Sequence, residues 1–270
     1  MANKEFLQRH PVEYYDPSKP WPPELWLVED MFFTGGRINF VLGKEKSGKS
    51  RFTLWLIAHM LADLRPFGLR VDKPPKKILW VLGEESIRNS QWRLTRYAEL
   101  LGVDPKDWTD RIAWMPGAGM SLERGDKRSG LVAAIVAEKA DLVVIDPLRR
   151  VHNAAESQDR QFDTVLNAFR EWTQQLDIDI LVQHHTGKVG EDADWGQIAT
   201  WARGTSDIAG ILDSACYVQR YGPEDKDGGS RVKLLRGGRH APDDKKWILY
   251  DMGREDKDRP SQTDKGWKMV

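Results

Sequence analysis

Cysteine is nearly absent from the sequence, since Cys216 is the only one among 270 residues. One thiol excludes a disulfide framework within the chain and a zinc site built from several thiolates. We expect Cys216 to be a small, buried apolar side chain. An excess of charge is absent too, because 41 Lys and Arg residues balance 41 Asp and Glu residues. Proteins that wrap duplex nucleic acid usually carry a strong basic excess, so this balance argues against that class but is compatible with a local basic groove.

Long apolar runs are also missing. The longest nearly apolar stretch, Thr53 to Leu61, contains His59 and is far shorter than the roughly 20 residues that cross a bilayer. Charges and prolines interrupt residues 1–30, so the secretory pattern of a basic start and an apolar segment does not appear. We therefore expect a cytoplasmic protein that does not contact membranes.

Apolar, strand-like runs alternate with amphipathic stretches through the middle of the chain. Strands are expected at 37–42, 77–83, 111–116, 141–146 and 178–184, and helices at 50–64, 86–101, 129–140 and 158–176. This order predicts an α/β fold with a mainly parallel central sheet. The later runs 215–219, 230–235 and 246–250 lie close together between Gly, Asp and Pro turns. We expect them to extend the sheet as antiparallel strands.

The two ends of the chain differ from this core, which we place at residues 35–252. Residues 1–34 are rich in aromatics and prolines and show no helical or strand period. We interpret them as an arm or linker that packs on the core or on a neighbouring chain. Residues 253–270 are highly charged, and we expect a frayed, flexible tail.

One segment carries the strongest functional signal, because it matches the phosphate-loop pattern G-x-x-x-x-G-K-[ST]. We expect a nucleoside triphosphate to be bound by Gly43, Lys44, Glu45, Lys46, Ser47, Gly48, Lys49, Ser50 and Arg51. A strand-like run precedes the segment and a helix-like run follows it, as the pattern requires. Lys49 is expected to reach the β- and γ-phosphates, and the Ser50 hydroxyl to hold Mg²⁺. ATP and Mg²⁺ are therefore the expected cofactors.

ATP hydrolysis also needs a carboxylate near Mg²⁺ and a base for the attacking water. Asp146 ends an apolar strand in the manner of a Walker B segment, and we expect it to bind the Mg²⁺ shell. Glu84 and Glu85 follow the strand at 77–83. We assign the base to Glu84 and expect Glu85 to stand at the start of the next helix.

Two further groups complete the expected catalytic set. Gln183, His184 and His185 end the fifth strand, where a polar side chain would sense the γ-phosphate. The two histidines are not expected to share a metal ion, because neighbours in a strand point to opposite faces. A cation for the transferred phosphoryl group is expected from a neighbouring chain. The candidates, each alternatively a surface ion pair, are Arg203, Arg236 and Arg239.

With these residues placed, the chain resembles the RecA-like ATPase core, and most closely the small RepA-type hexameric replicative helicases and their phage relatives. The resemblance runs from about Pro22 to Asp251. It rests on the phosphate loop and on Gly35-Gly36, Glu84-Glu85-Ser86, Arg93-Leu94, Asp146-Pro147-Leu148, His184-His185-Thr186-Gly187-Lys188 and Arg203-Gly204-Thr205-Ser206. It implies a hexameric ring with ATP between subunits, Glu84 as base, and His184 as the link between γ-phosphate and single-stranded DNA.

The loops after the third and fifth strands, 117–129 and 186–202, are where such rings contact DNA. Phosphate neutralisation and base stacking are expected from Arg124, Lys127, Arg128, Lys188, Trp195 and Trp201. The second loop departs from this role, because Glu191, Asp192 and Asp194 make it more acidic than a loop that binds DNA strands should be.

Three functions remain open at this point. The first is a ring-forming, ATP-driven helicase or translocase on single-stranded DNA that acts in DNA replication. The second is a RecA-like recombination or annealing factor that forms filaments. The third is a regulatory ATPase that oligomerises on ATP and binds protein partners, which the neutral charge and the acidic second loop favour.

Overall fold

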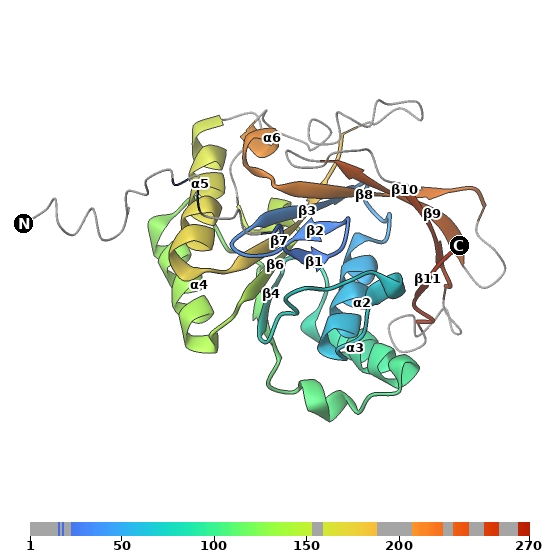
Figure 1. The fold of residues 1–270 in the computed structure, drawn as a ribbon. Coiled ribbons are helices and arrows are strands. Elements are labelled where there is room, and N and C mark those ends of the chain that lie inside the picture. Colours follow the sequence, from blue (N-terminus) through green and yellow to red (C-terminus); the bar gives the residue numbers. More distant parts are fainter. Residues whose placement is uncertain are drawn as a thin grey trace, which may run out of the picture.

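A nine-stranded sheet with the order β11-β10-β9-β8-β3-β7-β6-β4-β5 forms the centre of the structure (Figure 1). The structure is a computed structural model and describes residues 16, 18, 23–152, 159–187, 207–223, 229–237, 246–253 and 264–270. The parallel strands are β3 (Ile38–Gly43), β4 (Ile78–Leu82), β5 (Ile112–Pro116), β6 (Leu142–Asp146), β7 (Asp179–His185) and β8 (Ser214–Tyr221). Beyond them lie the antiparallel strands β9 (Ser230–Gly237), β10 (Lys246–Asp251) and β11 (Trp267–Met269).

The predicted α/β class and the antiparallel extension of the sheet are confirmed. One strand differs from the expectation. β8 was expected to be antiparallel, but it pairs with β3 in parallel, and the direction reverses only between β8 and β9. The sequence of β8 does not distinguish these arrangements, because a buried strand has the same apolar pattern in either direction.

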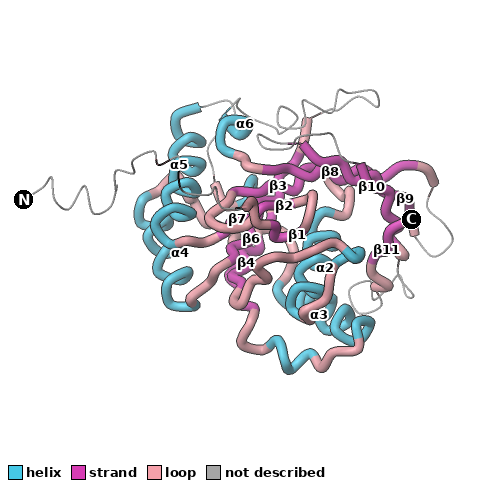
Figure 2. Tube along the Cα trace, in the orientation of Figure 1, coloured by secondary structure: helices cyan, strands magenta, loops and turns pink. Residues whose placement is uncertain are grey.

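Helices cover both faces of the sheet, as Figures 1 and 2 show. One face packs against α2 (Lys49–Leu61) and α3 (Ile87–Leu101), and the other against α4 (Gly125–Glu138), α5 (Asp159–Leu176) and α6 (Asp207–Ile211). Successive strand residues alternate between the two cores: Trp80 packs on the α2–α3 side and Val81 on the α4–α5 side. Because both faces are covered, the central strands β4 and β6 are apolar on both sides up to their carboxyl ends. None of the helices in the described part of the chain is long and apolar enough to cross a membrane.

The chain just before β3 belongs to the core. β1 (Trp26–Val28) and β2 (Phe32–Phe33) form a small two-stranded sheet, most of which is buried. The Asn39 side chain on β3 accepts from the Phe33 N–H at 3.0 Å and donates to the Phe33 carbonyl at 2.9 Å. Residues 26–33 are therefore regular structure attached to the sheet, and not the irregular arm expected from composition. Residues 1–15 lie outside the described residues.

The end of the chain joins the same sheet. β11 pairs with β10, and Trp267 and Asp264 are 2% and 0% exposed. The ring of Trp267 packs edge-on against Phe52 of α2, with centroids 5.7 Å apart. The interpretation of residues 253–270 as a frayed tail is therefore wrong for residues 264–270, whereas residues 254–263 lie outside the described residues.

Candidate active site

The phosphate loop connects β3 to α2 at the carboxyl edge of the parallel strands, where ligands bind in open α/β sheets. Two of its positions require glycine. A Cβ atom on Gly43 would lie 2.6 Å from the carbonyl oxygen of Val218 on β8. Gly48 has φ of 97°, a left-handed conformation that L side chains rarely adopt. The backbone therefore turns tightly before α2. The N–H groups of Lys49, Ser50 and Arg51 in the first helical turn have no carbonyl partner within the helix, so they are available to bind phosphate at the loop.

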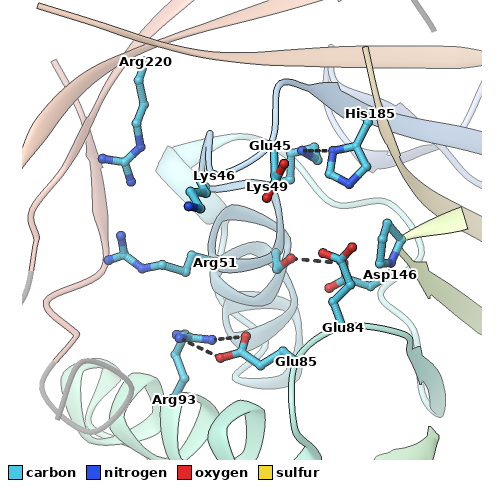
Figure 3. A pocket seen from close by; sticks show the side chains of 13 residues that line it. Glu45, Lys46, Lys49, Arg51, Glu84, Glu85, Arg93, Asp146, His185 and Arg220 are labelled. Carbon is cyan, nitrogen blue, oxygen red and sulfur yellow. Dashed lines mark hydrogen bonds and ion pairs between the residues drawn. The ribbon is translucent and has the colours of Figure 1, made fainter. Parts of the chain in front are cut away.

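A cavity of about 450 Å³ opens in front of this loop (Figure 3). Its lining brings together residues from the loop after β3, the first turn of α2, the segment after β4, helix α3 and the ends of β6, β7 and β8. These residues are Glu45, Lys46, Gly48, Lys49, Ser50, Arg51, Glu84, Glu85, Arg93, Asp146, Pro147, His185 and Arg220. The structure therefore places the phosphate loop, the Walker B aspartate and both candidate bases around one cavity.

Lys49 is a buried cation of the loop. Its ammonium group donates to the carbonyls of Gly43 at 2.9 Å and Lys44 at 2.8 Å, and lies 3.4 Å from Nδ1 of His185. Burial lowers the pKa of Lys49 to about 8, although Asp146, Glu84 and Glu45 oppose the shift. A polyphosphate beside this ammonium would favour its charged form, as the expected role in binding β- and γ-phosphates requires.

The Ser50 hydroxyl lies 3.1 Å from Oδ1 of Asp146 and 3.2 Å from Oε1 of Gln183. Burial raises the pKa of Asp146 to about 7, while the bond from Ser50 opposes the shift. Its second oxygen, Oδ2, is buried without a hydrogen-bond partner among the residues that the structure describes. A hydroxyl and a buried carboxylate oxygen with unused acceptor capacity fit Mg²⁺, which prefers oxygen ligands and retains waters. Ser50 and Asp146 would hold such an ion.

The two glutamates after β4 have different partners. Oε1 of Glu84 accepts from Nε of Arg150 at 2.9 Å, and the Glu84 side chain is 42% exposed. Glu85 accepts two bonds from Arg93 on α3, at 2.8 and 3.2 Å. It precedes Ser86, which caps α3 by accepting from the Asn89 N–H. A bidentate pair fixes Glu85, so Glu84 is the better placed to meet a water. Its role as base stays a prediction.

The polar residues at the end of β7 face opposite sides of the sheet. Leu181 of β7 packs on the α2 side, and Ile180 and Val182 pack on the opposite side. Continued alternation directs Gln183 and His185 toward the phosphate loop, where both contact its residues. His184 is 0% exposed and does not line the cavity. His184 therefore does not lie where a γ-phosphate sensor was expected, and His185 and Gln183 are the residues of this strand that face the phosphate loop.

The three candidate arginines have different outcomes. Arg203 and Arg239 lie outside the described residues. Arg236 on β9 is 1% exposed, and its guanidinium carbon lies 4.9 Å from the ring centre of Trp26 and 5.1 Å from that of Phe33. Burial lowers the pKa of Arg236. A side chain enclosed under the β1–β2 sheet does not reach a neighbouring chain, so the expectation for Arg236 is wrong.

Two basic residues expected to contact DNA have local roles in the structure. Arg128 donates to the carbonyls of Leu122 and Glu123, both at 2.8 Å, and so fixes the turn before α4. Arg124 forms an exposed ion pair with Asp126 at 3.1 Å. Lys188, Trp195 and Trp201 of the second loop lie outside the described residues.

Sequence reasoning overlooked the polar residues that connect the loop to the end of the chain. Arg51 donates to Asp251 at 2.6 Å and to Asp264 at 2.5 and 2.7 Å, and Arg220 donates to Asp251. Nε of Arg93 lies 3.4 Å from Asp264. These carboxylates sit in charged, turn-rich stretches that resemble solvated segments. Trp267 and Met269, an apolar pair at strand spacing, were the signal for a further strand.

Comparison with known proteins agrees with this geometry. Residues 4–191, more than half of the 270, match the AAA domain family AAA_25. A search among curated proteins gave no significant match. Together with the phosphate loop, Ser50 and Asp146 around one cavity, the match shows that the chain belongs to the AAA_25 family and thus to the P-loop ATPases.

Proposed function

We propose that this ATPase is a ring-forming motor that hydrolyses ATP with Mg²⁺ and moves along single-stranded DNA during DNA replication. The observation that carries the proposal is the convergence of Lys49, Ser50, Asp146 and Glu84 on one cavity at the carboxyl edge of the sheet. The four groups come from three separate segments of the chain, and each matches one requirement of phosphoryl transfer.

The proposed reaction is an in-line displacement at the γ-phosphorus. Glu84 accepts a proton from the attacking water as the new P–O bond forms, and the bond to the β-phosphate oxygen breaks to release ADP and phosphate. Lys49 neutralises charge on the β- and γ-phosphates, and His185 and Gln183 lie on the γ-phosphate side. Ser50 and Asp146 would hold Mg²⁺, which would supply positive charge to offset the charge that develops during the transfer.

The motor part of the proposal is supported by a second cavity, of about 540 Å³, beside the first. The two cavities share Glu45, Glu84 and His185, and the second is also lined by Ala118 and Gly119 of the loop after β5. A change at the γ-phosphate would therefore act directly on this loop. The second loop, which follows β7, begins next to His185. The arginine that neutralises the transferred phosphoryl group would come from a neighbouring subunit, and Arg203 and Arg239 remain candidates for it.

Single-stranded DNA is expected to stimulate ATP hydrolysis several-fold at low salt, because strand binding would order the two loops next to the γ-phosphate. The measurement is the steady-state ATPase rate with and without an oligonucleotide, with Lys49→Ala as the inactive control. An unchanged rate at saturating oligonucleotide would contradict the DNA motor and leave ATP hydrolysis intact. Electron microscopy of the same samples separates closed rings from the open helices of a recombination filament.

A second function is favoured by one specific observation: Arg124 and Arg128 bond to nearby residues of the same segment, 122–128. This supports a regulatory ATPase that assembles on ATP and acts on protein partners. A gel-mobility assay with a non-hydrolysable ATP analogue separates the two. Unshifted single-stranded and duplex DNA, with ATP-dependent assembly retained, would support the regulatory function.

A further inference from the structure

One arginine outside the expected catalytic set reaches the nucleotide cavity. Arg220 on β8 lines it, and Nη2 lies 3.3 Å from the position that a Cβ atom on Gly48 would occupy. Figure 3 shows its guanidinium entering from β8 on the side of Lys46 and Arg51, away from Asp146 and Glu84. Arg220 therefore lies beside the phosphate loop, at the end of the cavity opposite the reacting groups.

Buried acceptors on the neighbouring antiparallel strands orient this guanidinium. Nη2 donates to Oδ2 of Asp251 on β10, and Nη1 donates to the Ser230 hydroxyl on β9. Asp251 is 0% exposed and also accepts from Arg51 at 2.6 Å. Two bonds to different strands restrict the rotation of the guanidinium, so it is preorganised for a ligand in the cavity.

Three arginines line this end of the cavity, but they differ in exposure. The Arg51 side chain is 7% exposed and forms ion pairs with Asp251 and Asp264. The Arg93 side chain is 6% exposed and forms ion pairs with Glu85 and Asp264. The Arg220 side chain is 23% exposed. Of the three arginine side chains, that of Arg220 is therefore the most accessible to a ligand in the cavity.

The position along the loop indicates which phosphate this end would receive. Lys49 and the Ser50–Asp146 pair define the β- and γ-phosphate end. The α-phosphate and nucleoside then extend past the first turn of α2, toward Arg51 and Arg220. A guanidinium carries five N–H donors in a planar fork, which lets it bond a carboxylate and a phosphate together.

We propose that Arg220 binds the α-phosphate of the nucleotide held by its own chain, and that Asp251 and the last strands of the sheet position it there. The inference rests on the proposed ATPase function and adds a binding residue to that site. It assigns Arg220 to affinity for both ADP and ATP, and not to the hydrolysis step.

Replacing Arg220 with Ala is expected to weaken binding of Mg–ADP and Mg–ATP alike, by about 10–100-fold, as for a lost charge-assisted bond. The KM for ATP should rise by a similar factor while kcat changes little. Binding is measured by titration calorimetry and turnover by phosphate release. The matched control is Arg231→Ala on the adjacent strand β9, an exposed residue that does not line the cavity; it should bind both nucleotides like the wild type.

Arg220→Gln is the second variant, because it can still donate to Asp251 but lacks the positive charge. If either variant folds, as judged by circular dichroism, and binds ADP like the wild type, the inference is overturned and the ATPase function stands. Unchanged ADP affinity with a large fall in kcat would also overturn it, because that is the pattern of a group acting on the γ-phosphate. If the wild type and Arg231→Ala both fail to bind nucleotide, the proposed function itself fails.

Discussion

Replacing Glu84 with Gln is expected to reduce ATP turnover about 10²–10⁴-fold, the usual contribution of a general base, with nucleotide affinity nearly unchanged. Glutamine keeps the shape of the side chain and can still contact Arg150, but it does not accept a proton from water. Glu84 is 42% exposed and lines both cavities at the γ-phosphate end, so little binding energy depends on its charge. The measurements are steady-state phosphate release and titration calorimetry with Mg–ATP.

Glu85→Gln is the matched comparison, one residue away in the same segment. Glu85 forms a bidentate pair with Arg93, so its replacement should loosen α3 against the loop and leave most of the turnover. If Glu85→Gln abolishes turnover and Glu84→Gln retains it, the base is Glu85 and the assignment is wrong by one position.

Replacing Asp264 with Ala is expected to lower the free energy of unfolding by about 3–5 kcal/mol, the typical loss when one partner of a buried ion pair is removed. Asp264 is 0% exposed and bonds to Arg51 at 2.5 and 2.7 Å, with Arg93 at 3.4 Å. Without it, Arg51 keeps only Asp251 as an ionic partner in the described part of the chain, and Arg93 keeps only Glu85. Urea denaturation followed by circular dichroism gives the difference, provided that the transition is two-state.

The same carboxylate gives the wild type an expected pH dependence. Burial alone would raise the pKa of Asp264, but hydrogen bonds and charge from Arg51, with smaller effects of Gly266 and Arg93, hold it below its ordinary value. A lowered pKa in the folded state contributes stability above the unfolded pKa of about 3.9, and the contribution is lost as the pH falls through the folded pKa. Asp264→Ala should therefore lose less stability than the wild type on acidification below about pH 4.

Asp126→Ala is the control for this prediction, because Asp126 forms an exposed ion pair with Arg124. Surface pairs of this kind contribute little to stability, so this variant should unfold close to the wild-type midpoint. Equal midpoints for Asp264→Ala and the wild type would contradict the structural role of residues 264–270.

The local parts of the site were predictable from the sequence because each is defined by neighbours along the chain. The phosphate loop lies between a strand and a helix, and Asp146 directly follows four apolar residues of β6. The five core strands lie within one residue of their expected positions for the same reason. Helix α4 begins at Gly125, earlier than the expected residue 129, because Gly125 and Gly130 weakened the helical pattern.

What the sequence does not specify is which face or partner a residue meets. β7 is buried on both sides, so its apolar run carries no alternation to show that His185 and Gln183, and not His184, face the loop. Arg220 and Arg236 lie on adjacent antiparallel strands of similar composition. Only the register of β8 against β3 and the phosphate loop brings Arg220 to the cavity and leaves Arg236 under Trp26.

The most direct test of the account is titration of the purified protein with ATP in the presence of Mg²⁺, at two temperatures so that a vanishing enthalpy does not conceal binding. One saturable binding event per chain is expected, which weakens when Mg²⁺ is removed and is lost in Lys49→Ala. No heat at either temperature with folded wild-type protein, or equal binding by Lys49→Ala, would contradict it.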